Sequence, residues 1–377
     1  MGYWGGQDGD DTITPGFISE WVLPPFSGFP SAGLDRLSGK GGDDYLDGGG
    51  GADTLRGEEG NDTLVVRQGG EFSGGTGDDL MLVVSAGAGT VIAGGLGNDS
   101  LDAQTAVDIT GASLVSLEYL LLDSFDLTLT GAQLDSFGVT AADGSATTGQ
   151  LVLSGGGAAQ TDLRGLLVLN ITGSSADERL LFTTSTSTNT RINVDGGLGN
   201  DSIVAAEGND TLVGGFGLDT LVGGAGADRL TGDDANDRLA GGTGSDTLDG
   251  GAGVDVIAGD SGSDRLTGGS GPDRFHYAFA SEGTDTITDF VRGSDLIEID
   301  ASGFGGGLVA GASLPAARLV VHASSLATAP AGTGQFIFNT VTDRLSWDVD
   351  GAGGASAVTI AVLTGQVTFA TSDFALI

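Results

Sequence analysis

A strict nine-residue period constrains the fold of this chain more than any other feature of its sequence. Residues 196–276 divide without a gap into nine nonapeptides, from GGLGNDSIV to GGSGPDRFH. Position eight of every unit is leucine, isoleucine or phenylalanine, and position six is always aspartate: Asp201, Asp210, Asp219, Asp228, Asp237, Asp246, Asp255, Asp264 and Asp273. An unbroken short period is typical of a solenoid, in which each repeat packs only against its neighbours.

Each unit predicts a short strand followed by a tight turn. Position eight and its two neighbours can form a strand that points one apolar side chain inward. The glycines permit positive φ angles, so the turn can bring its carbonyl groups together. If two nonapeptides form one coil, each unit stacks on the second unit after it at about 4.8 Å, and the sixth-position carboxylates form a column.

Such a column of carboxylates requires a cation. Two charges 4 Å apart interact by about 1 kcal/mol in bulk water and by several times more at a partly buried site. Calcium accepts six to eight oxygen ligands in flexible geometry, whereas magnesium is smaller and demands an octahedron. We therefore expect Ca²⁺ to bind the sixth-position carboxylates together with carbonyls of the glycine turns. The alternative is that these aspartates only form Asx turns.

The nonapeptide resembles the repeat of the repeats-in-toxin (RTX) family, G-G-x-G-x-D-x-U-x, where U is a large apolar residue. The resemblance covers the repeat arrays and implies a parallel β-roll that binds several calcium ions. The expected fold class is therefore all-β: a parallel β-roll or β-solenoid of calcium-binding nonapeptides, followed by a β-rich capping domain.

A second, less regular array precedes the first. Its sixth-position aspartates are Asp11, Asp35, Asp44, Asp53, Asp62, Asp79 and Asp99. Residues 85–93 carry Thr90 where the aspartate should be, which argues against calcium at that unit. In the regular array, Ala235 replaces a turn glycine, and Asp233 and Asp260 replace second-position glycines. We expect these substitutions to distort the local turn and to leave its carboxylate in place.

An aromatic, proline-rich insert, residues 15–32, interrupts the less regular array. It contains Trp21 and Phe26, in a chain with only 6% aromatic residues. Two roles fit this composition. The insert can fold over the open end of the first coil, or it can form a contact patch for another molecule.

The remaining residues form two further regions. Short strand-like runs in residues 103–194 predict a continuing β-solenoid, with a β-sandwich as the alternative. Residues 278–377 are similar to the C-terminal region of RTX proteins at Asp289, Phe290, Asp295, Ile297, Asp300, Trp347, Asp348, Asp350, Asp373 and Phe374. This resemblance implies a cap on the roll and an uncleaved type I secretion signal. Four regions are thus predicted: 1–102, 103–194, 195–277 and 278–377.

Charge and composition exclude several classes of function. The chain has 51 Asp plus Glu against 14 Lys plus Arg, a formal net charge of −37. It should repel phosphate backbones and anionic lipids, so neither nucleic acid nor a membrane surface is an expected partner. The absence of cysteine excludes disulfides and thiolate metal sites. Neither a cleavable N-terminal signal nor an apolar run of membrane-spanning length is visible.

No catalytic constellation stands out, and we expect no enzyme. The chain has only two histidines, His276 and His322, and neither lies in an H-E-x-x-H zinc motif. A G-x-S-x-G nucleophile elbow is also absent from the sequence. Carboxylates abound, yet nothing singles out a pair with the spacing that a glycosidase needs.

The leading hypothesis is a secreted, extracellular structural protein of a Gram-negative bacterium, which assembles into a filament, surface layer or matrix once calcium binds. A solenoid has two different ends, which favours a homopolymer with head-to-tail contacts. Trp21 and Phe26 are the expected anchors of one contact surface, and residues 304–312 or 374–377 are candidates for the other. The alternatives are a monomeric calcium-dependent adhesin or glycan-binding module, and an accessory to an enzyme.

Overall fold

A computed structural model describes the regular array completely and the rest of the chain in part. The described residues are 2–5, 12–14, 17–18, 32–104, 107–117, 119–121, 126–129, 133, 139–141, 148–153, 157–164, 168–172, 178–183, 191–322, 333–351, 356–364 and 369–377. Asp11, Trp21 and Phe26 lie outside them. Contacts divide the chain into unit 1 (Met1–Ser174 with Arg179–Thr190) and unit 2 (Ser175–Glu178 with Arg191–Ile377), and the four predicted regions remain a prediction.

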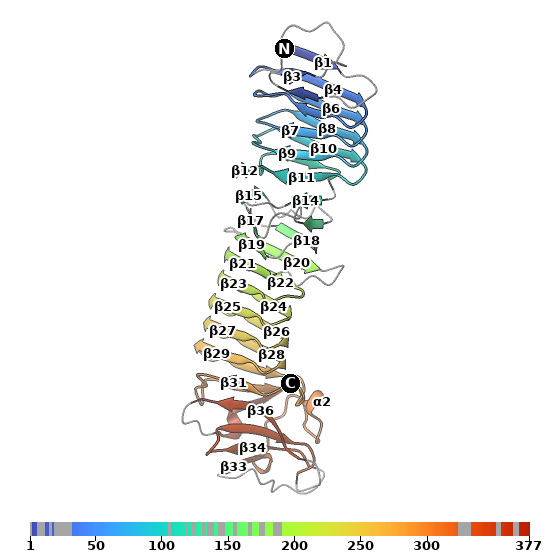
Figure 1. The fold of residues 1–377 in the computed structure, drawn as a ribbon. Helices are drawn as coiled ribbons and strands as arrows, with labels where there is room; N and C mark the ends of the chain where they lie inside the picture. Colours follow the sequence, from blue (N-terminus) through green and yellow to red (C-terminus); the bar gives the residue numbers. More distant parts are fainter. Residues whose placement is uncertain are drawn as a thin grey trace. The chain divides into compact units, whose positions relative to one another are not determined.

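In unit 1, successive strands alternate between parallel sheets (Figure 1). One sheet has the order β1 (Gly2–Gly5), β4 (Asp35–Gly41), β6 (Thr54–Glu59), β8 (Glu71–Thr76), β10 (Val91–Leu96) and β13 (Ser113–Val115). A second series joins β2 (Thr12–Thr14), β5 (Tyr45–Asp47), β7 (Thr63–Val66), β9 (Leu80–Val83), β11 (Ser100–Ala103), β14 (Tyr119–Leu121), β16 (Val139–Ala141) and β18 (Gly157–Arg164). Strand β3 (Phe17–Ile18) pairs antiparallel with β2.

The region after the less regular array continues the parallel pairing. A third series contains β12 (Val107–Asp108), β15 (Asp126–Leu129), β17 (Thr148–Leu153) and β19 (Val168–Thr172), and each strand pairs parallel with the next. Strand β20 (Glu178–Thr183) follows in the sequence. Parallel pairing of successive strands is the arrangement of a solenoid, and it disagrees with the antiparallel pairing expected of a β-sandwich.

Unit 2 contains the regular roll and the region after it. One parallel series is β22 (Ser202–Val204), β24 (Thr220–Ala225), β26 (Arg238–Gly244), β28 (Val256–Gly262), β30 (Arg274–Tyr277), β32 (Leu296–Ile299) and β37 (Phe374–Leu376). The other begins with β21 (Arg191–Leu198), β23 (Thr211–Phe216), β25 (Arg229–Asp234), β27 (Thr247–Ala252), β29 (Arg265–Ser270) and β31 (Asp285–Ile287). The predicted all-β parallel solenoid is confirmed.

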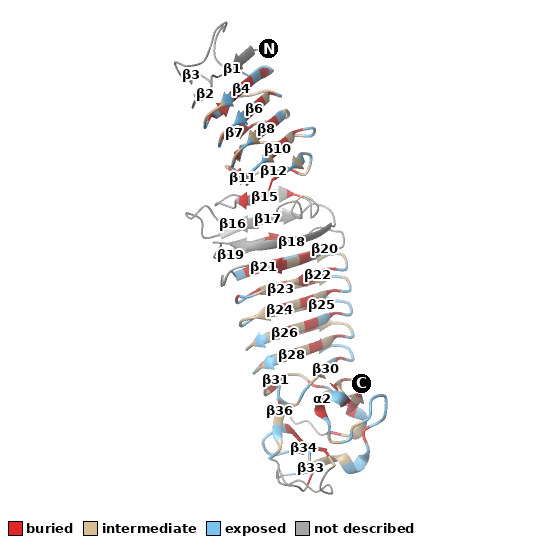
Figure 2. Ribbon diagram, turned by 90° about the vertical axis from the view of Figure 1, so that its right-hand side faces the viewer, coloured by how far each residue is buried: buried red, intermediate tan, exposed pale blue. Residues whose placement is uncertain are grey.

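The core of the roll is a narrow column of aliphatic side chains from position eight. Leu212, Leu230, Leu248 and Leu266 lie in register on β23, β25, β27 and β29, and each is fully buried. Figure 2 shows the resulting buried stripe across successive strands. Burial of one such side chain contributes about 1.5–3 kcal/mol, so every coil adds a similar increment of stability.

Three non-glycine residues keep a positive φ angle where glycine stands elsewhere in the roll. Asp233, Ala235 and Asp260 have φ angles of 73°, 83° and 61°. Asp233 pairs in register with Gly215 and Gly251, whose φ angles are 104° and 100°. The expected distortion is present but local: φ of Ala235 is well below the 136° of Gly217 and the 158° of Gly253, and the Gly217 N–H lies 3.4 Å from the Asp234 carbonyl oxygen. The parallel register extends through these turns, and the cost appears as backbone strain of roughly 1–2 kcal/mol per residue.

After the roll the chain forms a capping region whose strands extend both sheets. Strand β36 (Val358–Leu363) pairs parallel with β31 and antiparallel with β35 (Arg344–Asp348), which in turn pairs with β34 (Gln335–Asn339). Strand β33 (Leu319–His322) ends this sheet, and the short helices are α2 (Ala301–Phe304), η1 (Ala316–Arg318) and η2 (Thr371–Asp373). Among the described residues, no helix is long and apolar enough to cross a membrane.

Aromatic rings fill the interior of this capping region. Phe336 contacts Trp347 and Phe374, with ring centroids 4.6 and 4.8 Å apart. Phe304 packs on the same group and is 3% exposed. The rings of Phe304 and Phe374, which were candidates for an intermolecular contact, are therefore buried within their own chain, whereas Val309 and Ile377 remain exposed.

Candidate metal centre

The sixth-position aspartates stand in two columns, one along each edge of the roll in unit 2. In each column the backbone N–H of one aspartate donates to Oδ1 of the aspartate 18 residues later. The N···O distance is 2.7 Å from Asp201 to Asp219 and 2.8 Å from Asp237 to Asp255. All nine aspartates are at most 3% exposed. The predicted stacking of alternate repeats is thereby confirmed, and one carboxylate oxygen of each aspartate in these pairs is a structural acceptor.

The second carboxylate oxygen has a different environment. Oδ2 is buried and accepts no hydrogen bond in the following aspartates: Asp62, Asp79, Asp210, Asp228, Asp237, Asp246, Asp255, Asp264 and Asp273. A buried carboxylate oxygen without a donor costs free energy unless a cation or proton compensates it. The same unsatisfied acceptor oxygen recurs in coil after coil, so it is a property of the repeat and not of one irregular turn.

Eight of the nine nonapeptides begin with a glycine, and that glycine lies against Oδ2 of the aspartate in its own unit; the unit of Asp210 begins with Ala205. A methyl group placed on Gly250 would lie 2.5 Å from Asp255 Oδ2 and 2.7 Å from the carbonyl oxygen of Gly268 in the next coil. Gly250 therefore leaves no room for a side chain, and a carboxylate and a carbonyl oxygen meet at this point. Hard cations such as Ca²⁺ take ligands of this kind.

The charged form of these aspartates is unfavourable without a cation. Burial raises the pKa of Asp79, Asp210, Asp237 and Asp264 to about 7, against the lowering effect of the backbone N–H that each carboxylate accepts. For Asp237, the charges of Asp219 and Asp255 in the same column raise the pKa further. The electrostatic strain expected from stacked carboxylates is thus present in the folded roll.

On each edge of the roll, every coil offers one aspartate carboxylate and the backbone carbonyls of a glycine turn. These oxygen ligands suit calcium. Within the described part of the chain, no three His, Asp or Glu side chains converge as a metal-binding cluster. A six- to eight-coordinate calcium ion would therefore complete its shell with carbonyls of the glycine turns and water. The residues present match this requirement better than that of a transition metal, which would need nitrogen or sulfur ligands.

The less regular array repeats the column along one edge of unit 1. Asp44, Asp62, Asp79 and Asp99 are buried, and each successive N–H donates to the next Oδ1 at 2.8–2.9 Å. On the other edge the N–H of Asp35 donates to Asp53 Oδ1 at 2.9 Å, and there the aspartates end. Asp11 lies outside the described residues.

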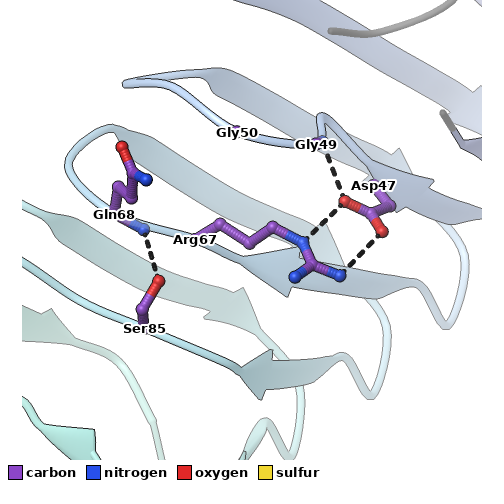
Figure 3. A pocket seen from close by; sticks show the side chains of 6 residues that line it. All are labelled: Asp47, Gly49, Gly50, Arg67, Gln68 and Ser85. Atoms are coloured by element: carbon purple, nitrogen blue, oxygen red, sulfur yellow. Dashed lines mark hydrogen bonds and ion pairs between the residues drawn. The ribbon is translucent and has the colours of Figure 1, made fainter. Parts of the chain in front are cut away.

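Side chains hold the turns where the second column of unit 1 stops (Figure 3). Arg67 Nε and one terminal nitrogen of its guanidinium donate to Asp47 Oδ1 and Oδ2 at 3.1 and 3.2 Å, and the N–H of Gln68 donates to Ser85 Oγ at 3.0 Å. The Thr90 hydroxyl lies 2.7 Å from the Gln68 carbonyl oxygen. Asp47, Arg67, Gln68, Ser85 and Thr90 are here called the Arg67 clasp, and they join three successive turns. The first four of them, with Gly49 and Gly50, line a hollow of about 340 Å³.

A second ladder, which the sequence analysis missed, uses position five. Asn200 Oδ1 accepts the N–H of Leu218 at 2.8 Å, and Asn209 Oδ1 accepts that of Ala227 at 2.9 Å. Asn236 repeats the contact with Val254. The recurring dipeptide Asn-Asp was the available signal, because an Asn amide can satisfy a turn N–H of the next coil independently of any metal.

Two further aspartates extend the columns beyond the last nonapeptide. The N–H of Asp264 donates to Asp285 Oδ1, and that of Asp273 donates to Asp295 Oδ1, both at 3.1 Å. The sequence analysis missed Asp285 and assigned Asp295 only to the C-terminal resemblance. The signal was present: GTDTI and GSDLI both keep Gly, Asp and an apolar residue at positions four, six and eight.

Comparison with known proteins agrees with this geometry. The family model of the RTX calcium-binding nonapeptide repeat matches residues 30–64, 193–221, 213–248, 231–266 and 240–275. A search of curated proteins gave no match. The matched segments contain both aspartate columns of the regular roll and Asp35, Asp44, Asp53 and Asp62 of the less regular array. Residues 30–64 and 193–275 of this chain are therefore RTX calcium-binding nonapeptide repeats, folded as a parallel β-solenoid.

Proposed function

We propose that the sixth-position aspartates of both arrays bind calcium and that the rolls fold only when it is bound. The observation that carries this proposal is the recurring buried Oδ2 that accepts no hydrogen bond, as in Asp210, Asp228 and Asp246. When bound, calcium supplies positive charge and accepts these oxygens as ligands. The chain's own residues do the rest: Oδ1 joins the coils, and the first glycine keeps the position open.

Calcium removal tests this proposal directly. The binding free energy of a metal is folding free energy when no site exists in the unfolded chain. In excess chelator, circular dichroism should show loss of most β-structure, and added calcium should restore it. Magnesium at the same concentration should not. Full β-structure in chelator would contradict the proposal.

The proposed setting is extracellular, after type I secretion from a Gram-negative cell. Extracellular calcium modules have dissociation constants of about 10⁻⁴ to 10⁻³ M, far above the calcium concentration of a cytosol. A chain with such sites stays unfolded inside the cell and folds after export. No catalytic step is part of this proposal.

We further propose that the folded chain acts as a structural protein by head-to-tail assembly. A contact between two different surfaces of one chain does not close on itself and propagates into a fibre. Strand β33 supports such a contact, because among the described strands it pairs only with β34, and Val321 on it is 41% exposed. Edge strands of this kind accept a further strand from another chain.

The insert is the proposed partner surface, with Trp21 and Phe26 as anchors. Large rings concentrate binding energy when they are buried at the centre of an interface. The double variant Trp21→Ala, Phe26→Ser should fold in calcium as the wild type does and should fail to sediment as polymer. A folded variant that still polymerises would reject the insert as the contact. A calcium-loaded wild type that stays monomeric at high concentration would reject assembly and favour the binding-module alternative.

A further inference from the structure

The last strand of the regular array departs from the repeat at its ninth position. On the series of strands that includes β30, position nine of the preceding units is valine or alanine: Val204, Val222, Ala240 and Ala258. In β30 this position is His276, the only histidine of the array. Glu298 lies in register beside it on β32, the first strand of this series after the array. An imidazole and a carboxylate therefore stand where the repeat elsewhere has small apolar side chains.

These two side chains lie close together without a hydrogen bond between them. His276 Nδ1 is 3.4 Å from Glu298 Oε1, and this nitrogen is buried and makes no hydrogen bond. An N–H···O hydrogen bond would be about 2.7–3.2 Å long. Whichever ring nitrogen carries the proton, Nδ1 is left with an unused donor or acceptor, which costs free energy at a buried atom.

Arg274 fixes the orientation of the carboxylate. Its guanidinium donates to Glu298 Oε2 at 2.8 Å, and Glu298 is 7% exposed. The second oxygen, Oε1, is therefore held toward His276. Carboxylates that bind metals are commonly oriented by such a hydrogen bond to their other oxygen. The His276 side chain is 17% exposed, so an ion can reach the pair from solvent.

The separation of the two atoms fits two ligands of one metal ion. Zinc binds imidazole nitrogen at about 2.0–2.1 Å and carboxylate oxygen at about 2.0–2.2 Å, and a tetrahedral angle between these bonds puts the ligand atoms about 3.4 Å apart. Calcium takes oxygen ligands at about 2.3–2.6 Å and does not select imidazole. Imidazole nitrogen suits zinc, copper and nickel.

A second carboxylate lies near this pair, at a strained position. Asp260 of β28 replaces a second-position glycine and has a φ of 61°. Burial raises the pKa of Asp260, while the charges of His276 and Arg238 lower it, so the carboxylate is within electrostatic reach of the imidazole. Strained residues and departures from a local rule gather at functional sites. Asp260, His276 and Glu298 are three such departures in one place.

We propose that His276 Nδ1 and Glu298 Oε1 bind a zinc ion or a similar transition-metal ion, with Asp260 supplying further negative charge. Within the described part of the chain no three side chains converge as a ready-made metal cluster, so two protein ligands are in place and water completes the shell. The ion would join β30 of the array to β32 of the capping region. Its nitrogen ligand distinguishes this site from the aspartate columns, and the inference goes beyond the proposed function.

Calorimetric titration with zinc chloride, on the full chain in saturating calcium, provides the first test. The wild type should bind zinc, His276→Gln should lose this binding, and Glu298→Gln should weaken it about tenfold. His322→Gln is the matched control, because His322 is the only other histidine of the chain, and it should bind zinc as the wild type does. Circular dichroism in calcium should be the same for all four proteins. Equal zinc affinity in His276→Gln and the wild type would overturn the proposal.

Copper(II) provides a second test that leaves the site unaltered. In His322→Gln the only imidazole is that of His276. Pulsed electron paramagnetic resonance detects the remote ring nitrogen of an imidazole bound to copper. At substoichiometric copper this signal should be present in His322→Gln. Copper bound without an imidazole would overturn the proposal.

Asp260→Gly separates a metal-binding role from a structural one. Glycine relieves the strain of a positive φ, so the melting temperature in calcium should rise, whereas zinc affinity should fall because a nearby negative charge is lost. Asp233→Gly is the control, since it relieves a φ of 73° on the other series of strands and should leave zinc affinity unchanged. An unchanged zinc affinity in Asp260→Gly would reject the part that Asp260 has in the site.

Discussion

At the residue scale, each sixth-position aspartate performs two separable tasks. Oδ1 accepts a backbone N–H of the neighbouring coil, as Asp264 does from Asp246 at 2.8 Å, and Oδ2 faces the first glycine of its own repeat. An Asp→Asn substitution keeps an oxygen acceptor for the ladder and removes the charge. An Asp→Ala substitution removes both, so the two variants divide the stability of a coil into a part that needs the cation and a part that does not.

Asp246→Asn should therefore weaken calcium binding more than folding. We expect a lower melting temperature at limiting calcium and a partial recovery as calcium increases, because a ligand that binds only the folded state stabilises it by mass action. Asp246→Ala should lose in addition about 1–3 kcal/mol that calcium does not restore, since the N–H of Asp228 then lacks its acceptor. Calorimetric melting across a calcium series separates the two. Identical curves for both variants would contradict the division of tasks.

The raised pKa values of the column predict an unusual dependence on pH. Without calcium, burial holds the pKa of Asp210 and Asp237 at about 7 and that of Asp228 at about 6, whereas an unfolded aspartate titrates near about 3.9. At pH values between the unfolded and the folded pKa, the folded roll binds more protons than the unfolded chain. The free energy of unfolding therefore decreases as the pH rises through this range.

In chelator, mild acid should therefore partly replace calcium. Circular dichroism should show more β-structure at about pH 5 than at about pH 8, because protons neutralise the column. In calcium titrations, lowering the pH from about 8 to about 5 should raise the calcium concentration at which half of the chains are folded, since protons compete with calcium for the carboxylates. An apo chain equally unfolded at both pH values would show that protons do not stabilise the columns in place of calcium.

At the scale of the element, the turn is the unit whose chemistry varies. Most turns of the roll close through glycine and aspartate, while the Arg67 clasp joins three turns of unit 1 through an ion pair and side-chain contacts to the backbone. Asp47 and Arg67 are partly exposed, with side-chain accessibilities of 12% and 36%, so their ion pair contributes about 0.5–1 kcal/mol.

Arg67→Ala should lower the stability of unit 1 by that modest amount, and the loss should not shrink as calcium increases. This behaviour differs from that of Asp246→Asn, whose loss calcium reduces. Arg67→Lys should recover only part of the loss, because an ammonium group cannot make both contacts to Asp47. A calcium-dependent deficit in Arg67→Ala would mean that this edge also binds the metal.

The sequence predicts the repeating elements better than their exceptions. The strand, the inward position-eight side chain and the aspartate column follow from a period of nine, since alternation and stacking allow few other arrangements. The positive φ of Asp233 and Asp260 did not follow, because pairing with neighbouring coils forces a backbone that local preference disfavours. Asp285 was not predicted because the spacing from Asp264 is 21 residues and not 18. The Arg67 clasp was not predicted because it joins residues about twenty positions apart in the sequence.

At the scale of the whole molecule, stability should be nearly additive in coils. Each coil of the roll contacts only the coils before and after it, so removal of one complete coil should leave the others intact. Deletion of residues 220–237 takes out two nonapeptides and joins Asp219 directly to Arg238, which preserves the order of positions six and seven.

The shortened chain should fold in calcium and bind two fewer ions. Equilibrium dialysis with radioactive calcium gives the stoichiometry, and circular dichroism confirms folding. The control is a variant that loses 18 residues which are not contiguous, taken from the same region. This deletion breaks the nine-residue period and should prevent the roll from folding. An unchanged ion count in the shortened chain would show that the columns do not hold one ion per repeat.

The ladder that joins Asp201, Asp219 and Asp237 also has a mechanical consequence. When a force pulls on the two ends of such a stack, the same hydrogen bonds between successive coils carry it one after another. The least stable coil therefore unfolds first, while the other coils stay folded. Unfolding of one coil of 18 residues releases about 6 nm of extended chain. Pulled in calcium-rich water, the roll would lengthen in equal steps and rewind when slack, in the manner of a reversible shock absorber.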